Sequence, residues 1–189
     1  MKAIFKNLKK EYESHTKNRY LIINDSNQAL HQAKQAIFAL HRDEFSQAQK
    51  LLFQIEKTLI GLQPNLKKVP DFKYTGAYKA ALEEYLEAKL FYQVLKFEKM
   101  KPISKIKINF ADYLAASCDL TGELVRKIVL LATEGDVKRA RDLKELIAEI
   151  VGELTKINLT GYLRHKYDDA KRNLKKAEEI LYDLKIRKG

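Results

Sequence analysis

Residues 163–187 read LRHKYDDAKRNLKKAEEILYDLKIR, and this stretch decides the fold class. Its apolar residues recur at alternating steps of four and three, and they are Leu163, Tyr167, Ala170, Leu174, Ala177, Leu181 and Leu184. That period is typical of a helix that packs along one seam, within a bundle or between subunits. The sequence therefore predicts an all-α protein.

The rest of the chain continues the helical pattern. Only 7 Gly and 3 Pro interrupt 189 residues, a length that fits one domain over 1–189. Helices are expected from the start to His41 with a bend or cap around 24–26, over 43–62, through Glu84 and Glu87 to before Pro102, through Asp119 and Glu123 to about 134–136, over 137–157 and over 160–186. Residues 103–108, ISKIKI, are the one short segment with strand-like alternation.

The composition and net charge indicate which classes of ligand this protein binds and where in the cell it is expected. The net charge of +11 favours a polyanion, with nucleic acid ahead of an anionic membrane surface, because no segment is long and apolar enough to span a bilayer. The N-terminal MKAIFKNLKKEYESH lacks the apolar core of a signal peptide, so we expect a cytoplasmic protein. The single Cys118 offers no disulfide framework, and we expect it to be a core residue rather than a nucleophile.

Two pairs of carboxylates stand among small and apolar residues. Glu84 and Glu87 lie in AALEEYLEAKLF, and Asp119 and Glu123 lie in AASCDLTGELVRK. Residues three or four apart are neighbours on a helix, so each pair shares one face. Ionised carboxylates in apolar surroundings are costly unless a cation neutralises them.

Two interpretations of these acids stay open at this point. Oxygen ligands suit Mg²⁺, Mn²⁺ or Ca²⁺ rather than Zn²⁺, so the acids could form a metal site. Alternatively, they could form a structural salt-bridge network with Lys89, Arg126 and Lys127.

Basic residues gather in two places that could follow a phosphate backbone. The set on the last helix is Arg164, His165, Lys166, Lys171, Arg172 and Lys175. The second set, interleaved with Tyr74 and Tyr78, is Lys67, Lys68, Lys73 and Lys79. Basic and aromatic residues together suit single-stranded nucleic acid. The alternative is a solvated face on which Lys171 and Lys175 pair with Asp168 and Glu178.

Four segments resemble the translin and translin-associated factor X family. Residues 163–187 resemble the C-terminal helix of translin. The stretches ADYLAASCDLTGELVRK with its following TEGD turn, AIFALHR and ALEEYLEA are similar to the factor X subunit. The resemblance runs from about residue 20 to the end of the chain.

The resemblance implies a helical bundle of six to seven helices that assembles into a hollow, roughly octameric shell and binds RNA or single-stranded DNA. It also implies that the factor X subunit is a Mg²⁺-dependent nuclease, which eukaryotes combine with translin subunits in RNA silencing. The family's acidic EYxEA and DLTGE segments match Glu84 with Glu87 and Asp119 with Glu123. The short connection KMKPISKIKIN between the acidic helices points to a simpler homo-oligomer, and a translin-like partner subunit stays open.

The functional expectation is therefore an endoribonuclease that hydrolyses phosphodiester bonds at Mg²⁺ or Mn²⁺. Glu84, Glu87 and Asp119 are expected to hold the ion, and Glu123 to hold it or to orient the attacking water. Two alternatives remain, namely a non-catalytic nucleic-acid-binding oligomer and a purely structural helical scaffold.

Overall fold

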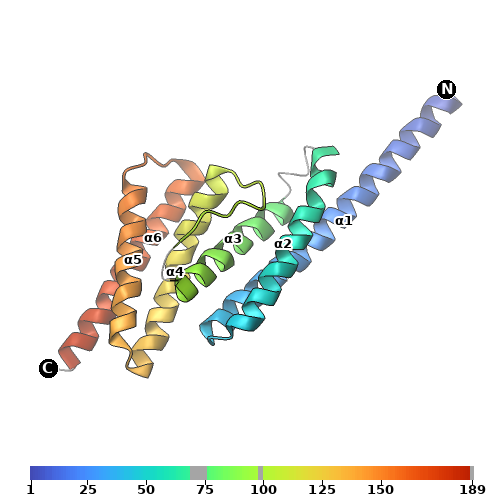
Figure 1. Cartoon of the computed structure of the whole chain (residues 1–189). Helices are drawn as coiled ribbons and strands as arrows, with labels where there is room; N and C mark the ends of the chain where they lie inside the picture. Colours follow the sequence, from blue (N-terminus) through green and yellow to red (C-terminus); the bar gives the residue numbers. More distant parts are fainter. Residues whose placement is uncertain (69–75, 98–99, 188–189) are drawn as a thin grey trace. The chain divides into compact units, whose positions relative to one another are not determined.

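The computed structural model describes residues 1–68, 76–97 and 100–187, apart from the side chains of residues 67, 68, 97 and 187. These residues form six helices (Figure 1), which are α1 Lys2–His41, α2 Phe45–Lys68, α3 Gly76–Phe97, α4 Phe110–Glu134, α5 Val137–Thr155 and α6 Gly161–Arg187. No strand occurs among the described residues, so the predicted all-α class is confirmed. None of these helices is long and apolar enough to cross a membrane.

The chain divides into two compact units. Unit 1 comprises Met1–Ala88 and Pro102–Lys107, and unit 2 comprises Lys89–Lys101 and Ile108–Gly189. Helix α3 therefore contributes its first part to unit 1 and its last part to unit 2. The single domain expected over 1–189 stays a prediction.

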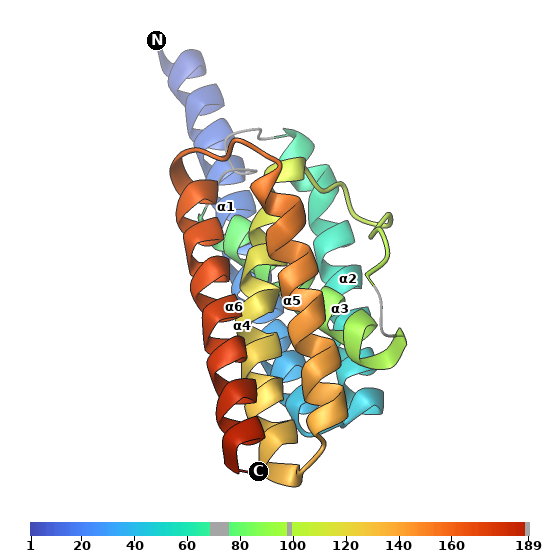
Figure 2. The ribbon, with the colours of Figure 1, turned by 90° about the vertical axis from the view of Figure 1, so that its left-hand side faces the viewer.

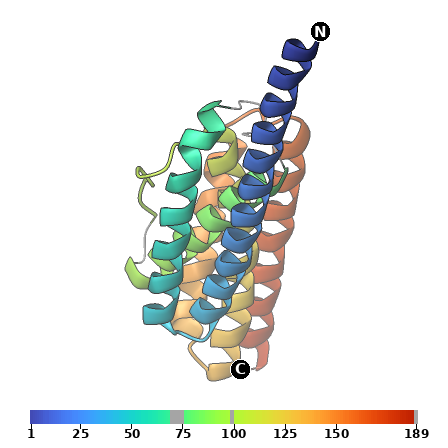
Figure 3. The same ribbon diagram turned by 90° about the vertical axis from the view of Figure 1, so that its right-hand side faces the viewer.

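In unit 1, α1 and α2 pack side by side as a helical hairpin (Figure 3). The buried face of α1 begins at Ile22 and returns every three or four residues, for example at Ala29, Ala33 and Leu40. None of residues 1–21 is buried, because α2 covers only the second part of α1. The small side chains on this face let the two helices approach closely.

In unit 2, α4, α5 and α6 form a three-helix bundle in which each helix contacts the other two (Figure 2). Gly135 ends α4 in the left-handed conformation, at φ 84°, and the Asp136 side chain caps α5 by accepting the backbone N–H of Arg139 at 3.0 Å. Tyr167 and Ala177 are buried in the predicted seam of α6. The seam therefore packs inside the bundle.

Three details of the predicted secondary structure were wrong. Helix α1 runs through residues 24–26 without a break, because Ser26 belongs to its buried face rather than to a cap. Helix α2 continues past Pro64 to Lys68. A proline removes one backbone hydrogen bond from a helix, and Pro64 lies close enough to the end of α2 for the helix to tolerate this loss. Residues 103–108 are irregular rather than extended in a strand, with Ile106 as their buried residue.

Candidate functional site

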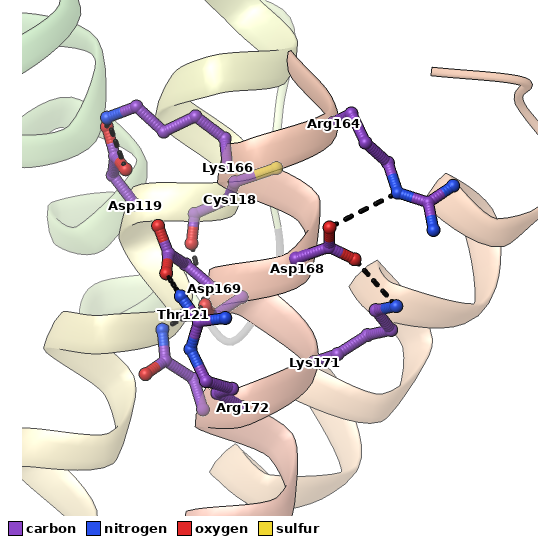
Figure 4. Close-up of polar contacts among 10 residues, drawn as sticks. Cys118, Asp119, Thr121, Arg164, Lys166, Asp168, Asp169, Lys171 and Arg172 are labelled. Atoms are coloured by element: carbon purple, nitrogen blue, oxygen red, sulfur yellow. Dashed lines mark hydrogen bonds and ion pairs between the residues drawn. The ribbon is translucent and has the colours of Figure 1, made fainter. Parts of the chain in front are cut away.

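Asp119 on α4 binds the ammonium group of Lys166 on α6. The Nζ atom of Lys166 donates to both carboxylate oxygens of Asp119, at 2.8 and 2.6 Å (Figure 4). Both side chains are partly exposed, 24% for Asp119 and 22% for Lys166. Burial acts to lower the pKa of Lys166, but the hydrogen bonds and charge of Asp119 raise it above its ordinary value. The lysine is therefore a full positive charge at neutral pH.

The register between α4 and α6 places Lys166 at Asp119. Two turns farther along α6, Asn173 donates a hydrogen bond to Oγ1 of Thr121 on α4, at 2.8 Å. One turn before Lys166, the ring centroid of Tyr162 lies 5.3 Å from the lysine Nζ. The ammonium is thus held by a carboxylate and an aromatic ring.

Glu123 follows Asp119 by one turn on the same face of α4. Its side chain is 24% exposed, and one carboxylate oxygen lies 3.9 Å from Nη1 of Arg126. The next residue of that face, Lys127, is completely buried. The predicted salt-bridge network thus includes the observed pair of Glu123 with Arg126. It did not include Lys166, the lysine that binds Asp119.

The other predicted pair, Glu84 and Glu87, lies on α3 in unit 1, and both side chains are partly buried. Tyr85 between them is completely buried, and its hydroxyl donates to Oε2 of Glu56 on α2 at 3.0 Å. The Nζ atom of Lys105 lies 2.8 Å from Oε1 of the same glutamate. Sequence reasoning missed Glu56 and Lys105, because no local pattern links residues that are far apart along the chain. They anchor the part of α3 that carries Glu84 and Glu87.

The chemistry of the carboxylates fits a divalent cation. Within either unit, the described residues contain no group of three or more His, Cys, Asp and Glu side chains arranged to hold a metal ion. Asp119 nevertheless binds a positive charge with both oxygens, and the Lys166 ammonium stands in for a cation there. Since carboxylate oxygens are the preferred ligands of Mg²⁺ and Mn²⁺, Asp119 and Glu123 are the donors that unit 2 could offer.

Four of the predicted basic residues of α6 pair with acids of the same helix. The solvated-face alternative expected the pair of Lys171 with Asp168, whereas Lys175 lies beside Glu179 rather than Glu178. Asp168 lies 2.7 Å from Lys171 and 3.2 Å from Arg164 (Figure 4), and hydrogen bonds from Lys171 and then Arg164 hold its pKa below the usual value. The other pairs are Arg172 with Asp169, and Lys175 with Glu179 at 4.0 Å. All four basic side chains are substantially exposed. Because such surface pairs are weak, a phosphate can replace the acid.

The second basic set is only partly described. Lys79 on α3 is exposed and lies 3.6 Å from Glu83. Lys67 and Lys68 end α2 rather than belonging to a connection, and Lys73 lies outside the described residues. This set stays a prediction.

Cys118 is 2% exposed, which confirms it as a core residue. Burial, and then the charge of Asp119, raise the pKa of its thiol to about 11, with Lys166 opposing the shift. A thiol with this pKa is almost wholly protonated at neutral pH and is a poor nucleophile.

A model of the translin family matches residues 6–188, nearly the whole chain. The chain belongs to the translin family. Membership in this family agrees with the resemblance of residues 163–187 to translin, and with that of the segments around the acidic residues to the factor X subunit. Asp119, Lys166 and the basic face of α6 all lie within the matched translin-family region.

Relatives of this chain include proteins named Translin and proteins named Translin-associated protein X. The Translin-associated protein X homolog of Schizosaccharomyces pombe is 29% identical over 206 residues, covering 98% of this chain and 87% of that protein. The mouse Translin-associated protein X is 23% identical, covering 97% of this chain and 78% of its own length. Human Translin is 37% identical over 81 residues, which covers 42% of this chain and 36% of Translin. The similarity to these two Translin-associated protein X sequences thus extends along nearly the whole chain, whereas the similarity to human Translin covers less than half of it.

Solved structures share the fold of this translin-family chain. The crystal structure of apo-NeC3PO superposes with a TM-score of 0.89 at 24% identity, covering 95% of this chain and 96% of that one. The structure of an AfC3PO complex with duplex RNA gives a TM-score of 0.85 at 19% identity, covering 97% of both chains. At these identities the likeness is one of fold.

Proposed function

We propose that this protein is a Mg²⁺-dependent endoribonuclease of the translin-associated factor X type. The observation that carries the proposal is Asp119, a partly exposed carboxylate that binds a positive charge with both oxygens in the DLTGE segment of α4. The full-length similarity to a Translin-associated protein X homolog supports this type of subunit. Mn²⁺ is the alternative ion, since it takes the same ligands.

The proposed roles follow the predicted acids. Glu84, Glu87 and Asp119 would hold the ion, and Glu123 would hold it or orient the attacking water. A bound Mg²⁺ would lower the pKa of a water molecule and offset negative charge on the phosphoryl oxygens. The buried hydroxyl of Tyr85 ties the part of α3 that carries Glu84 and Glu87 to Glu56 of α2.

The substrate class that we infer is RNA, bound through its backbone in an oligomer of this chain. The net charge of +11 and the exposed Arg164 and Lys171 support a polyanionic ligand. The AfC3PO structure holds duplex RNA, which favours RNA over other polyanions for this chain. Contacts to phosphates carry little base specificity. An octamer, a translin-like partner subunit, binding to single-stranded DNA and a cytoplasmic location are further parts of the proposal.

The test is cleavage of labelled single-stranded and duplex RNA by the purified protein, with Mg²⁺ or with a chelator. Asp119→Asn should lower the rate at least about 100-fold, because it removes a charged ligand while keeping the shape of the side chain. The matched control is Glu134→Gln, which neutralises an exposed acid of the same helix. Cleavage that persists in Asp119→Asn and in chelator would overturn the proposal.

A non-catalytic RNA-binding oligomer of the translin type is the second candidate. The similarity to human Translin over 81 residues favours it. In that case the protein binds RNA without cleaving it, in Mg²⁺ and in chelator alike, and Asp119→Asn changes neither affinity nor cleavage.

A further inference from the structure

We propose that Lys166 is an exchangeable counter-ion, which neutralises Asp119 in the metal-free protein and is released to an RNA phosphate when a divalent cation takes its place. The inference rests on the proposed function, because it assigns Asp119 to a metal ligand. It gives Lys166 a positioning role that the family match does not specify. Four features of unit 2 support it.

The first feature is competition for the same two oxygens. One Nζ atom lies within 2.8 Å of both carboxylate oxygens of Asp119, so a cation that binds this carboxylate meets a positive charge at contact distance. Two cations this close repel strongly in a partly buried position. Binding of one therefore displaces the other.

The second feature is that the Lys166 side chain reaches solvent. About a fifth of its side chain is exposed, and a lysine has a flexible four-carbon stem that can turn its charge toward solvent. The ring of Tyr162, 5.3 Å from Nζ, offers the ammonium a second favourable contact on its own helix.

The third feature is that the pair is not needed to align α4 with α6. The hydrogen bond between Asn173 and Thr121 and the buried Ala170 and Ala177 set the same register. Release of Lys166 from Asp119 can therefore leave the bundle intact.

The fourth feature separates Lys166 from the other basic residues of α6. Arg164 and Lys171 point away from α4 and are held by Asp168 (Figure 4). Lys166 instead points to Asp119, so a phosphate that it binds lies beside the proposed catalytic carboxylate. The released charge thus reaches a phosphate that Arg164 and Lys171 do not.

The first experiment measures Mn²⁺ affinity by electron paramagnetic resonance, without RNA and without turnover. Lys166→Met should bind Mn²⁺ about three- to tenfold more tightly than the natural protein, because the internal competitor is gone. Lys166→Arg should bind no more tightly than the natural protein, since a guanidinium grips both oxygens. The matched control is Lys175→Met, which removes the same charge from α6 but lies beside Glu179 rather than Asp119.

The outcomes separate the exchange from the proposed function. If Asp119→Asn binds Mn²⁺ as the natural protein does, the metal site itself is refuted. If Asp119→Asn loses the ion while Lys166→Met and Lys175→Met shift affinity equally, the exchange alone is refuted. Circular dichroism of each variant checks that the helices are retained.

The second experiment follows release of the lysine in the natural protein and so needs no variant to fold. Acetylation by an amine-reactive ester, read by mass spectrometry, should increase at Lys166 on addition of Mg²⁺ and stay constant at Lys175. A third measurement is binding of labelled RNA, with the length of the RNA checked afterwards to exclude cleavage. Lys166→Met should weaken binding in Mg²⁺ and leave it unchanged in chelator. Constant labelling of Lys166, or equal weakening in both buffers, would contradict the proposal.

Discussion

Glu56 and Asp119 are neutralised in different ways, and the difference indicates their roles. Glu56 is buried and accepts a hydrogen bond from the completely buried Tyr85, with Lys105 beside its other oxygen. Asp119 accepts two hydrogen bonds from Lys166 and remains partly exposed. A buried, fully bonded acid cannot exchange its partners cheaply, whereas a partly exposed ion pair can. Glu56 is therefore a structural residue, and Asp119 is the accessible one.

Tyr85→Phe should destabilise the protein by about 1–2 kcal/mol, because it removes a hydrogen bond to a buried charged group and leaves the remaining space almost unchanged. Burial, followed by the charge and hydrogen bond of Glu56, raises the pKa of Tyr85, so the native hydroxyl is a donor at all ordinary pH values. Urea unfolding measures the change. Tyr182→Phe, at an exposed position of α6, is the control and should have no effect.

Cys118 should resist thiol reagents in the native protein at pH 8. With a pKa of about 11, its thiolate fraction is roughly one in a thousand at that pH and rises about tenfold for each unit of pH up to the pKa. The measurement is the rate of reaction with a disulfide reagent between pH 7 and 10, against a sample unfolded in guanidinium. Equal rates in the folded and unfolded samples would show that Cys118 is neither buried nor shifted.

At the scale of the element, the joint between α4 and α5 depends on one residue. Gly135 has φ 84°, a conformation that a Cβ atom disfavours, and its backbone N–H closes the last turn of α4 onto Ala132. The next residue, Asp136, caps α5. The joint reverses the chain so that α5 packs on α4, the helix that carries Asp119.

Gly135→Ala should therefore destabilise the protein by about 1 kcal/mol, the cost of forcing an L side chain into the left-handed region. Gly152→Ala is the matched substitution, inside α5, where an added Cβ meets no atom within 4 Å. It should stabilise the protein by up to about 1 kcal/mol, because alanine is the better helix former. Thermal unfolding of the two variants should thus move in opposite directions.

At the scale of the whole molecule, the proposed RNA binding depends on the net positive charge of the chain. The chain carries 36 basic and 25 acidic residues, and the acids of α6 pair with part of its basic face. Surface pairs of this kind are worth little, so RNA phosphates can take over the basic side chains and release counterions. RNA affinity should therefore fall steeply as salt increases.

The double variant Arg164→Gln with Lys171→Gln should reduce the slope of log K against log salt by about two, roughly one for each basic side chain that no longer neutralises a phosphate. Fluorescence anisotropy with labelled RNA at several salt concentrations gives the slope. Lys9→Gln with Lys10→Gln removes the same charge from exposed positions of α1 and should leave the slope nearly unchanged. A similar reduction in both variants would mean that net charge alone attracts RNA and that the face of α6 has no special part.

Local pattern was sufficient for the class of the fold and for most of its elements. The seam of residues 163–187 becomes the packed face of α6, and Gly135 with Asp136 marks a helix joint as expected. These features follow from the period of a helix and from the conformational freedom of glycine, which act over a few residues. Pro64 and residues 103–108 were misjudged, because packing determines whether a helix survives a proline and whether an extended segment finds a partner strand.

By itself the sequence determined the helices, the positive charge, the buried setting of Cys118 and the pairing of Asp119 with Glu123 on one face. Only the tertiary structure decided that Lys166, predicted as an RNA contact, binds Asp119, and that Tyr85 and Lys105 meet at Glu56. The physical reason is distance along the chain. Asp119 and Lys166 are 47 residues apart, and their meeting depends on how α4 and α6 pack, which no local spacing encodes.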